Sequence, residues 1–207
     1  MKTCLIVFML LISTAVFGVD YWPTEIGATF HYVGDDEGVL DVVIQAGTLP
    51  NELVRRGDFV ASWGGGWFES STSIDENDDV FFVGIMRMNS GWIDPDIITL
   101  EPAMLMLDLP LTVGTIVNPD IMLGMDRDFV SVTVSGPETI IVPAGTFETM
   151  VVEIDWLFNS YLPDETLWLH KDLGPVKSEP YGWELTSFTG MVADEDLTFG
   201  GVKTLFR

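Results

Sequence analysis

Hydrophobic and polar positions alternate with a period of two along much of the chain, and no long segment after residue 18 keeps an apolar stripe at helical spacing. Runs of β-branched and aromatic residues recur between clusters of Gly, Pro, Asp and Asn, which are typical of turns. The pattern therefore predicts an all-β chain that is rich in hairpins. Strands are expected at residues 28–33, 39–46, 53–63, 67–72, 80–88, 104–109, 129–135, 139–142, 146–158, 166–170, 176–179, 183–191 and 197–205.

Two segments are apolar on both faces, which a sheet with one solvated face does not require. Residues 80–88 place Val80, Phe82, Met86 and Met88 on one face and Phe81, Val83 and Ile85 on the other. Residues 103–107 place Met104 and Met106 opposite Ala103, Leu105 and Leu107. Such segments form either ordinary core, the common role of apolar strand residues, or a concave face that accepts an apolar ligand. Because Met is flexible and polarisable, the second alternative makes five residues candidates for ligand binding: Phe82, Met86, Met88, Met104 and Met106.

Two further stretches combine glycine with aromatic residues or with proline. Trp63-Gly-Gly-Gly-Trp67 predicts either a cross-strand indole pair or an aromatic clamp for a sugar or lipid, so Trp63 and Trp67 are added to the candidate ligand-binding residues. Val142-Pro-Ala-Gly-Thr-Phe147 predicts a corner and no chemistry, since Pro143 presets φ and Gly145 can adopt the left-handed conformation. A three-residue hairpin loop, Pro143 to Gly145, is expected there.

The first 18 residues have the features of a secretory signal peptide: a basic residue at Lys2, an apolar run and a small-residue cleavage pattern that ends at Gly18. The apolar run is shorter than the roughly 20 residues of a spanning helix, so we expect no stable membrane span after cleavage. Residues 19–207 are then expected to form a single β domain outside the cytoplasm, either periplasmic or secreted. The expected fold is a curved antiparallel sheet that forms an open barrel or a sandwich.

Charge and cysteine content narrow the classes of partner and chemistry. The chain has 9 Lys and Arg against 32 Asp and Glu, a formal net charge of −23. Nucleic acid is excluded as a partner because binding to it depends on cationic contacts with phosphates, whereas a basic protein partner fits. The only cysteine, Cys4, lies in the predicted signal peptide, so disulfides, thiol catalysis and zinc-thiolate sites are not expected in the mature chain.

Candidate catalytic and metal-binding groups are few. Only His31 and His170 are present, without a nucleophile elbow, phosphate loop or paired metal-binding histidines, so we expect a non-enzymatic protein without a cofactor or a metal. The paired Met residues have a spacing that suits Cu(I), but core packing is the common role of Met. The acidic turn at residues 75–79 begins like a calcium loop and lacks its glycine, which leaves a solvated turn or an irregular calcium site.

Four motifs together resemble a pattern of uncharacterised secreted bacterial proteins and lipoproteins. They are Tyr21-Trp-Pro23 with Gly27, Leu109-Pro-Leu-Thr-Val-Gly-Thr115, Val142-Pro-Ala-Gly-Thr-Phe147 and Leu173-Gly-Pro-Val-Lys177. These proteins are loosely similar to LolA/LolB-type lipoprotein carriers. The resemblance implies an open barrel whose concave face accepts an apolar ligand. This chain lacks the lipobox cysteine of the lipoprotein members.

The sequence thus predicts an exported binding or carrier module for an apolar or amphiphilic ligand, such as a small molecule or a lipid. The alternative is a structural or interaction protein of the cell envelope or surface, and a hydrolase is a third possibility. A large internal apolar cavity would favour the first prediction. A filled interior with an exposed apolar edge would favour the second.

Overall fold

The computed structural model describes residues 21–190, apart from residues 36, 50, 62–63, 90–95, 124–125 and 157–163, and side chains at 85–89, 96–99, 119–120, 123 and 126–129 are also not described. The predicted signal peptide and the predicted strand at 197–205 therefore lie outside the described residues. The described chain contains twelve strands: β1 (Thr29–Val33), β2 (Val39–Ala46), β3 (Glu52–Ala61), β4 (Gly64–Ile74), β5 (Val80–Asn89), β6 (Asp96–Leu107), β7 (Gly114–Leu123), β8 (Asp126–Val142), β9 (Gly145–Trp156), β10 (Glu165–His170), β11 (Gly174–Glu179) and β12 (Trp183–Thr189).

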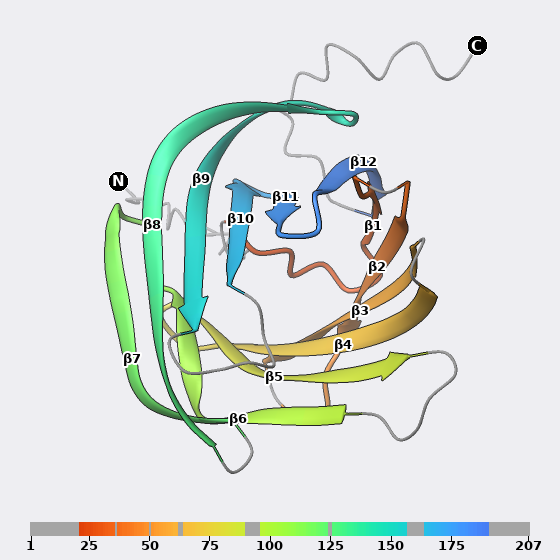
Figure 1. The fold of residues 1–207 in the computed structure, drawn as a ribbon. Coiled ribbons are helices and arrows are strands. Elements are labelled where there is room, and N and C mark those ends of the chain that lie inside the picture. The colour runs from red at the N-terminus through yellow and green to blue at the C-terminus, as the bar shows by residue number, and fades with distance from the viewer. Residues whose placement is uncertain are drawn as a thin grey trace, which may run out of the picture.

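The strands form one antiparallel barrel in which each strand pairs with its neighbours in sequence and β1 pairs with both β2 and β12. In Figure 1 they follow one another around a ring, with β3 to β6 low in the view and β7 to β9 on its left. The all-β, antiparallel prediction is confirmed, and the curved sheet forms a barrel. Pairing is short between β11 and β12, where only Lys177 with Glu184 and Ser178 with Trp183 are in register, and between β6 and β7, which also share two registered pairs. Among the described residues, no helix is long and apolar enough to cross a membrane.

The strand β7 was not predicted, and its sequence explains why. Asn118-Pro119-Asp120 has the composition of a turn, yet it lies inside the strand, where the register with β8 shifts between Asn118 and Ile121. The buried Asn118 side chain continues the pairing towards β6, because its Nδ2 donates to the Leu105 carbonyl at 3.0 Å and its Oδ1 accepts from the Leu105 N–H at 2.9 Å. An amide side chain thus replaces a missing stretch of backbone pairing.

The long strand β8 was predicted as two strands, 129–135 and 139–142. The structure keeps it continuous across Gly136-Pro137, where the register with β9 shifts, and the buried Thr149 hydroxyl donates to the Glu138 carbonyl at 2.9 Å. The β8–β9 corner at Val142-Pro-Ala-Gly is confirmed. Its loop has two residues instead of three, because Gly145 already pairs with Val142. The hairpin curves towards β12 (Figure 1), and the Ala144 N–H donates to the Leu185 carbonyl at 2.9 Å.

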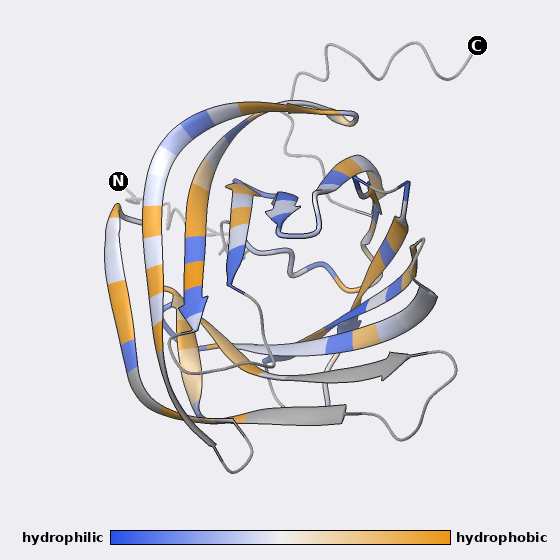
Figure 2. Cartoon of the chain, in the orientation of Figure 1, coloured by the Kyte–Doolittle hydropathy of each residue, from blue (hydrophilic) through white to orange (hydrophobic). Residues whose placement is uncertain are grey.

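Hydrophobic residues alternate with polar ones along the strands (Figure 2), as a barrel with a solvated outer face requires. The inward residues form two clusters. One cluster lies mainly on β6 to β10 and contains Trp22, Val80, Leu100, Met104, Met106, Leu107, Ile121, Val130, Val132, Val134, Val152, Ile154, Trp156, Leu167 and Leu169. The other lies mainly on β1 to β3 and β11 to β12 and contains Ala28, Phe30, Tyr32, Leu40, Val42, Ile44, Leu53, Val142, Phe147, Leu173, Val176 and Leu185.

Candidate ligand-binding cavity

A cavity of about 420 Å³ lies inside the barrel between the two hydrophobic clusters. This volume falls within the range of small-molecule sites in proteins. Most of its wall is apolar or aromatic. It is lined by Trp22, Tyr32, Leu40, Val42, Arg55, Phe59, Trp67, Phe68, Ser70, Thr72, Phe82, Met104, Met106, Ile154, Trp156, Glu165, Leu167, Pro175, Lys177, Ser178, Pro180, Tyr181 and Trp183.

Alternation along β3 and β4 produces one wall of the cavity. Arg55 pairs in register with Ser70, and Gly57 with Phe68, so these side chains share the inner face. Gly57 is required beside the Phe68 ring, because a Cβ at position 57 would lie only 2.5 Å from the ring carbons. The glycine therefore lets Phe68 lie flat against β3.

Three of the residues predicted from apolar patterning lie together in the adjoining wall, since β5 pairs with β4. Phe82 of β5 pairs with Met104 of β6, and Met104 and Met106 are both buried while also bordering the cavity. The thioethers thus belong to the core and to the cavity wall at once. The two alternatives for this patch, core or ligand-lined face, are not exclusive.

The other predicted residues have different surroundings. Trp67 borders the cavity, but its indole ring is stacked by the Arg56 guanidinium, whose Cζ lies 4.7 Å from the ring centroid. Met86 and Met88 pair by backbone register with Glu69 and Trp67, and their side chains are not described. Trp63 lies outside the described residues. The predicted alternation over residues 80–88 is interrupted, since the β4–β5 register shifts between Phe82 and Gly84.

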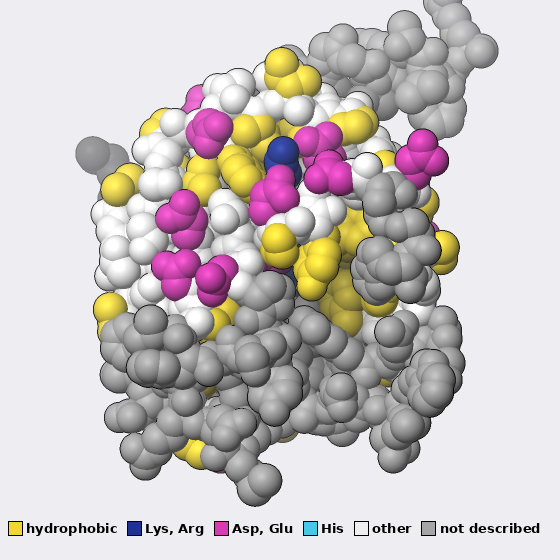
Figure 3. Space-filling model, in the orientation of Figure 1, with side chains coloured by type: hydrophobic (Ala, Val, Ile, Leu, Met, Phe, Trp, Pro, Cys, Tyr) yellow, Lys and Arg dark blue, Asp and Glu magenta, His cyan; other side chains and the backbone are white. Residues whose placement is uncertain are grey.

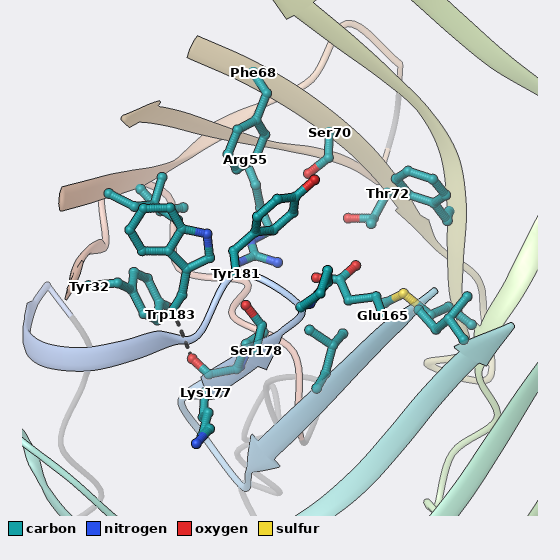
Figure 4. A pocket seen from close by; sticks show the side chains of 18 of the residues that line it. Tyr32, Arg55, Phe68, Ser70, Thr72, Glu165, Lys177, Ser178, Tyr181 and Trp183 are labelled. Atoms are coloured by element: carbon teal, nitrogen blue, oxygen red, sulfur yellow. Dashed lines mark hydrogen bonds between the residues drawn. The ribbon is translucent and has the colours of Figure 1, made fainter. Parts of the chain in front are cut away.

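Polar residues of the cavity were not predicted from the sequence. Figure 4 shows Arg55, Ser70, Glu165 and Ser178 pointing into the same space, whereas Lys177 points away from it. The ammonium group of Lys177 lies 3.2 Å from Glu184 and 3.7 Å from Glu179, beside the Trp168 ring. Arg55 is therefore the basic side chain that the described wall directs inward.

Arg55 is held by aromatic residues instead of carboxylates. Its Cζ lies 4.9 Å from the centroid of the Trp22 ring, and its Nε is buried without a hydrogen-bond partner. Among the described residues, no carboxylate forms an ion pair with it. Trp22 is fixed in turn by Thr72, whose hydroxyl accepts from the indole Nε1 at 3.2 Å. The guanidinium is thus positioned by packing, with hydrogen-bonding capacity left over.

Tyr32 lies next to Arg55 in the same wall. Its hydroxyl donates to the Pro175 carbonyl at 2.8 Å. Burial raises the pKa of Tyr32 to about 12, although the Arg55 charge and a hydrogen bond with Arg55 act in the opposite direction. The phenol is therefore neutral at physiological pH.

The turn between β11 and β12 borders the cavity with Pro180 and Tyr181, and the Tyr181 side chain is 48% exposed. Gly182 follows with a φ of +61°. Figure 3 shows hydrophobic side chains gathered in a hollow near the middle of the face in view, with Asp and Glu side chains above it and to its left.

The two histidines lie away from this cavity. His31 Nδ1 hydrogen-bonds with the Asp41 carboxylate on the outer face of β1 and β2. His170 contacts Phe147 edge-on, with ring centroids 5.2 Å apart, and burial lowers the pKa of His170 although Asp172 and Glu148 oppose the shift. Neither histidine lines the cavity beside Arg55.

The acidic turn at residues 75–79 uses its carboxylates for its own backbone. Asp75 Oδ1 accepts hydrogen bonds from the N–H groups of Asn77 at 2.8 Å and Asp79 at 3.0 Å. Asp79 Oδ1 accepts from the Leu109 N–H at 2.8 Å. Over the part of the chain that the structure describes, no group of three or more His, Cys, Asp and Glu residues is arranged to hold a metal ion. These contacts account for the acidic pattern as turn structure.

No protein-family model and no curated protein matches the chain. Among solved structures, it is similar to a Bacteroides fragilis protein described as exported, with a YmcC-like fold. The two chains are 16% identical, and the similarity covers 82% of this chain and 99% of the other at a TM-score of 0.41. A likeness at this level carries no argument about ligand or mechanism. The resemblance to LolA/LolB-type carriers stays a prediction.

Proposed function

We propose that this protein is an exported, non-enzymatic binding or carrier protein that holds an apolar or amphiphilic ligand inside its barrel. The observation that carries the proposal is the cavity of about 420 Å³ with a mainly apolar and aromatic wall. An apolar cavity of this size stabilises a ligand by removing its hydrocarbon surface from water. Export is supported by the signal-peptide pattern of residues 1–18.

The composition of the wall suits a ligand with a long apolar part. Met104 and Met106 are flexible thioethers, and Trp22, Trp156 and Trp183 provide broad aromatic surfaces. The polar groups project from β3, β4, β10 and β11, whereas β5 and β6 contribute the apolar side chains of Phe82, Met104 and Met106. A ligand that is apolar along most of its length and polar at one end matches this division.

Native mass spectrometry of the mature protein, purified from the extracytoplasmic fraction of its own host, tests the proposal. We expect a stoichiometric apolar or amphiphilic molecule that is released on denaturation and identified by extraction. In vitro, the uncharged fluorophore 1-N-phenylnaphthylamine is expected to bind to the emptied protein with increased emission. An empty protein that neither retains a molecule nor binds the fluorophore contradicts the proposal, and directs the search to protein partners, including basic ones.

A matched pair of variants places the binding inside the barrel. Ser70→Phe fills the cavity and is expected to abolish fluorophore binding. Ser73→Phe on the same strand is the control. Ser70 and Thr72 face the cavity, whereas Ser73, which pairs with Glu52, lies on the opposite, outer face of the strand. Both variants should unfold cooperatively in urea. Equal loss of binding in both, or in neither, would place the fluorophore outside the barrel.

A further inference from the structure

The cavity contains one feature that a purely apolar ligand would leave unsatisfied, the guanidinium of Arg55. Its Nε is buried without a partner, and no described carboxylate forms an ion pair with it. Arg55 is partly buried and hydrogen-bonds to Tyr32, so its charge lacks a carboxylate partner and its buried Nε lacks an acceptor, and both are unfavourable. Such a group is commonly retained where a ligand completes its interactions.

Arg56, the next residue on β3, can be compared with Arg55. Arg56 projects to the outer face, where Nη1 lies 3.0 Å from Glu69 and Nη2 lies 3.4 Å from Asp58. The arginine on the outer face is thus paired with carboxylates, whereas the arginine on the inner face has no carboxylate partner among the described residues. In a chain with 32 acidic residues against 9 basic ones, a carboxylate partner for Arg55 would be easy to supply.

The geometry of the cavity points to a ligand class: we infer that the ligand is an acyl-chain amphiphile with an oxyanion headgroup, a carboxylate or a phosphate, that is bound by Arg55. This inference rests on the proposed function. The planar guanidinium offers several donors to an oxyanion, and the Ser70 hydroxyl lies on the same face, since Ser70 pairs with Arg55 in register. The acyl chain would then extend towards Phe82, Met104 and Met106.

Glu165 faces the same space from β10 and limits where the headgroup can lie. Its carboxylate repels an anion, so the headgroup is expected beside Arg55 and Tyr32 instead of midway across the cavity. If Glu165 determined the preference, a cationic amphiphile would bind more tightly than an anionic one. Binding through Arg55 therefore predicts a preference for anionic amphiphiles, whereas binding through Glu165 predicts a preference for cationic ones.

Displacement of 1-N-phenylnaphthylamine by four amphiphiles with the same dodecyl chain tests the inference: dodecanoate, monododecyl phosphate, dodecan-1-ol and dodecylammonium. We expect at least one of the two anions to bind on the order of 10- to 100-fold more tightly than dodecan-1-ol, the range of charge-assisted hydrogen bonds. Dodecylammonium is expected to bind most weakly. Whichever anion binds more tightly identifies the headgroup as carboxylate or phosphate.

Three variants assign the preference to Arg55. Arg55→Met should reduce the anion-over-alcohol ratio to about 2-fold or less while dodecan-1-ol and the fluorophore still bind, which also confirms that the barrel is folded. Arg55→Lys should keep part of the ratio, because the charge remains and the fork of donors is lost. Arg56→Met, the matched control on the outer face, should keep the whole ratio.

The outcomes separate this inference from the proposed function. If the fluorophore and dodecan-1-ol bind but headgroup charge has no effect, or if dodecylammonium is preferred, the inference is wrong and the apolar site stands. Retention of the anion preference in Arg55→Met also overturns it. If neither the fluorophore nor any amphiphile binds, the proposed function itself fails.

Discussion

Two parts of the barrel interior are built from the same strands and differ in how they are filled. At one end, Phe30, Leu169 and Leu185 are almost completely buried within the two hydrophobic clusters. Tyr32, Leu167 and Trp183 each lie two positions away on the same strands, at the other end, and they border the cavity. A step of two residues along a strand therefore separates solid core from a hollow.

The difference shows how alternation can produce both a core and a binding site. Every inward position is shielded from bulk water, so the sequence at each must suit burial. At the filled end these positions carry the large apolar side chains of Phe30, Leu169 and Leu185, which are almost completely buried. At the hollow end they include Ser70 and Ser178, which are small and border the cavity. The cavity is thus made by small residues among large aromatic ones.

The largest effect on the free energy of unfolding is expected when two leucines of β10, Leu169 and Leu167, are compared. Leu169→Ala should lower the free energy of unfolding by about 3 to 5 kcal/mol, because it opens a new void in packed core. Leu167→Ala only enlarges an existing cavity, so its effect should be smaller by about 1 kcal/mol or more. Urea unfolding followed by intrinsic tryptophan fluorescence measures both. Equal losses would mean that the two ends are packed alike.

A smaller effect is expected at Tyr32, which lies next to the filled end. Tyr32→Phe should cost about 1 kcal/mol at pH 8, because the Pro175 carbonyl loses its donor. The folded pKa of Tyr32, about 12, exceeds its usual value of 10.0, so the folded state retains the proton longer than the unfolded state. Stability from this group is complete below pH 10 and is lost as the pH rises towards 12.

Two measurements check this prediction. Urea unfolding at pH 8 and pH 11 should show the wild type losing more stability than Tyr32→Phe over that interval. Tyrosinate absorbance should show one of the four tyrosines titrating late in the wild type, and the variant should lack that step. A wild type whose tyrosines all titrate together near pH 10 would contradict the buried position.

The smallest effects on stability are expected for the inner and outer arginines, Arg55 and Arg56. Arg55→Met should leave the ligand-free protein unchanged or more stable by about 1 kcal/mol, since it removes a partly buried charge that lacks a carboxylate partner. Arg56→Met removes surface ion pairs and a stacking contact, so a loss of about 0 to 1 kcal/mol is expected, which added salt should diminish. A large loss for Arg55→Met alone would show that Arg55 is structural.

Alternation and turn chemistry were sufficient to predict the all-β fold and the β8–β9 corner, and they singled out Phe82, Met104 and Met106, which border the cavity. They missed β7 because Asn118-Pro119-Asp120 resembles a turn, and only tertiary pairing with Leu105 holds it in a strand. They also missed Arg55 and Glu165. A charged residue in a strand usually faces solvent, and only closure of the sheet turns these two towards the interior.

The mixed composition of β3 offered a signal for Arg55. Leu53, Gly57 and Phe59 share its face, whereas Arg56 and Asp58 lie on the other. A cation flanked by glycine and apolar residues on one face fits a partly buried position better than a solvated one. Nothing comparable in the sequence marks Ser70 or Ser178, whose role depends on the residues opposite them in the closed barrel.

Methionine methyl NMR tests the central claim, that the hollow end holds an acyl chain, most directly. The ¹³C-methyl signals of Met104 and Met106, assigned with Met→Leu variants, are followed as dodecan-1-ol is added, and Met150, which does not border this cavity, is the internal reference. We expect saturable shifts of Met104 and Met106 with Met150 unchanged. Binding of dodecan-1-ol without movement of the first two signals, or no binding at all, would contradict the account.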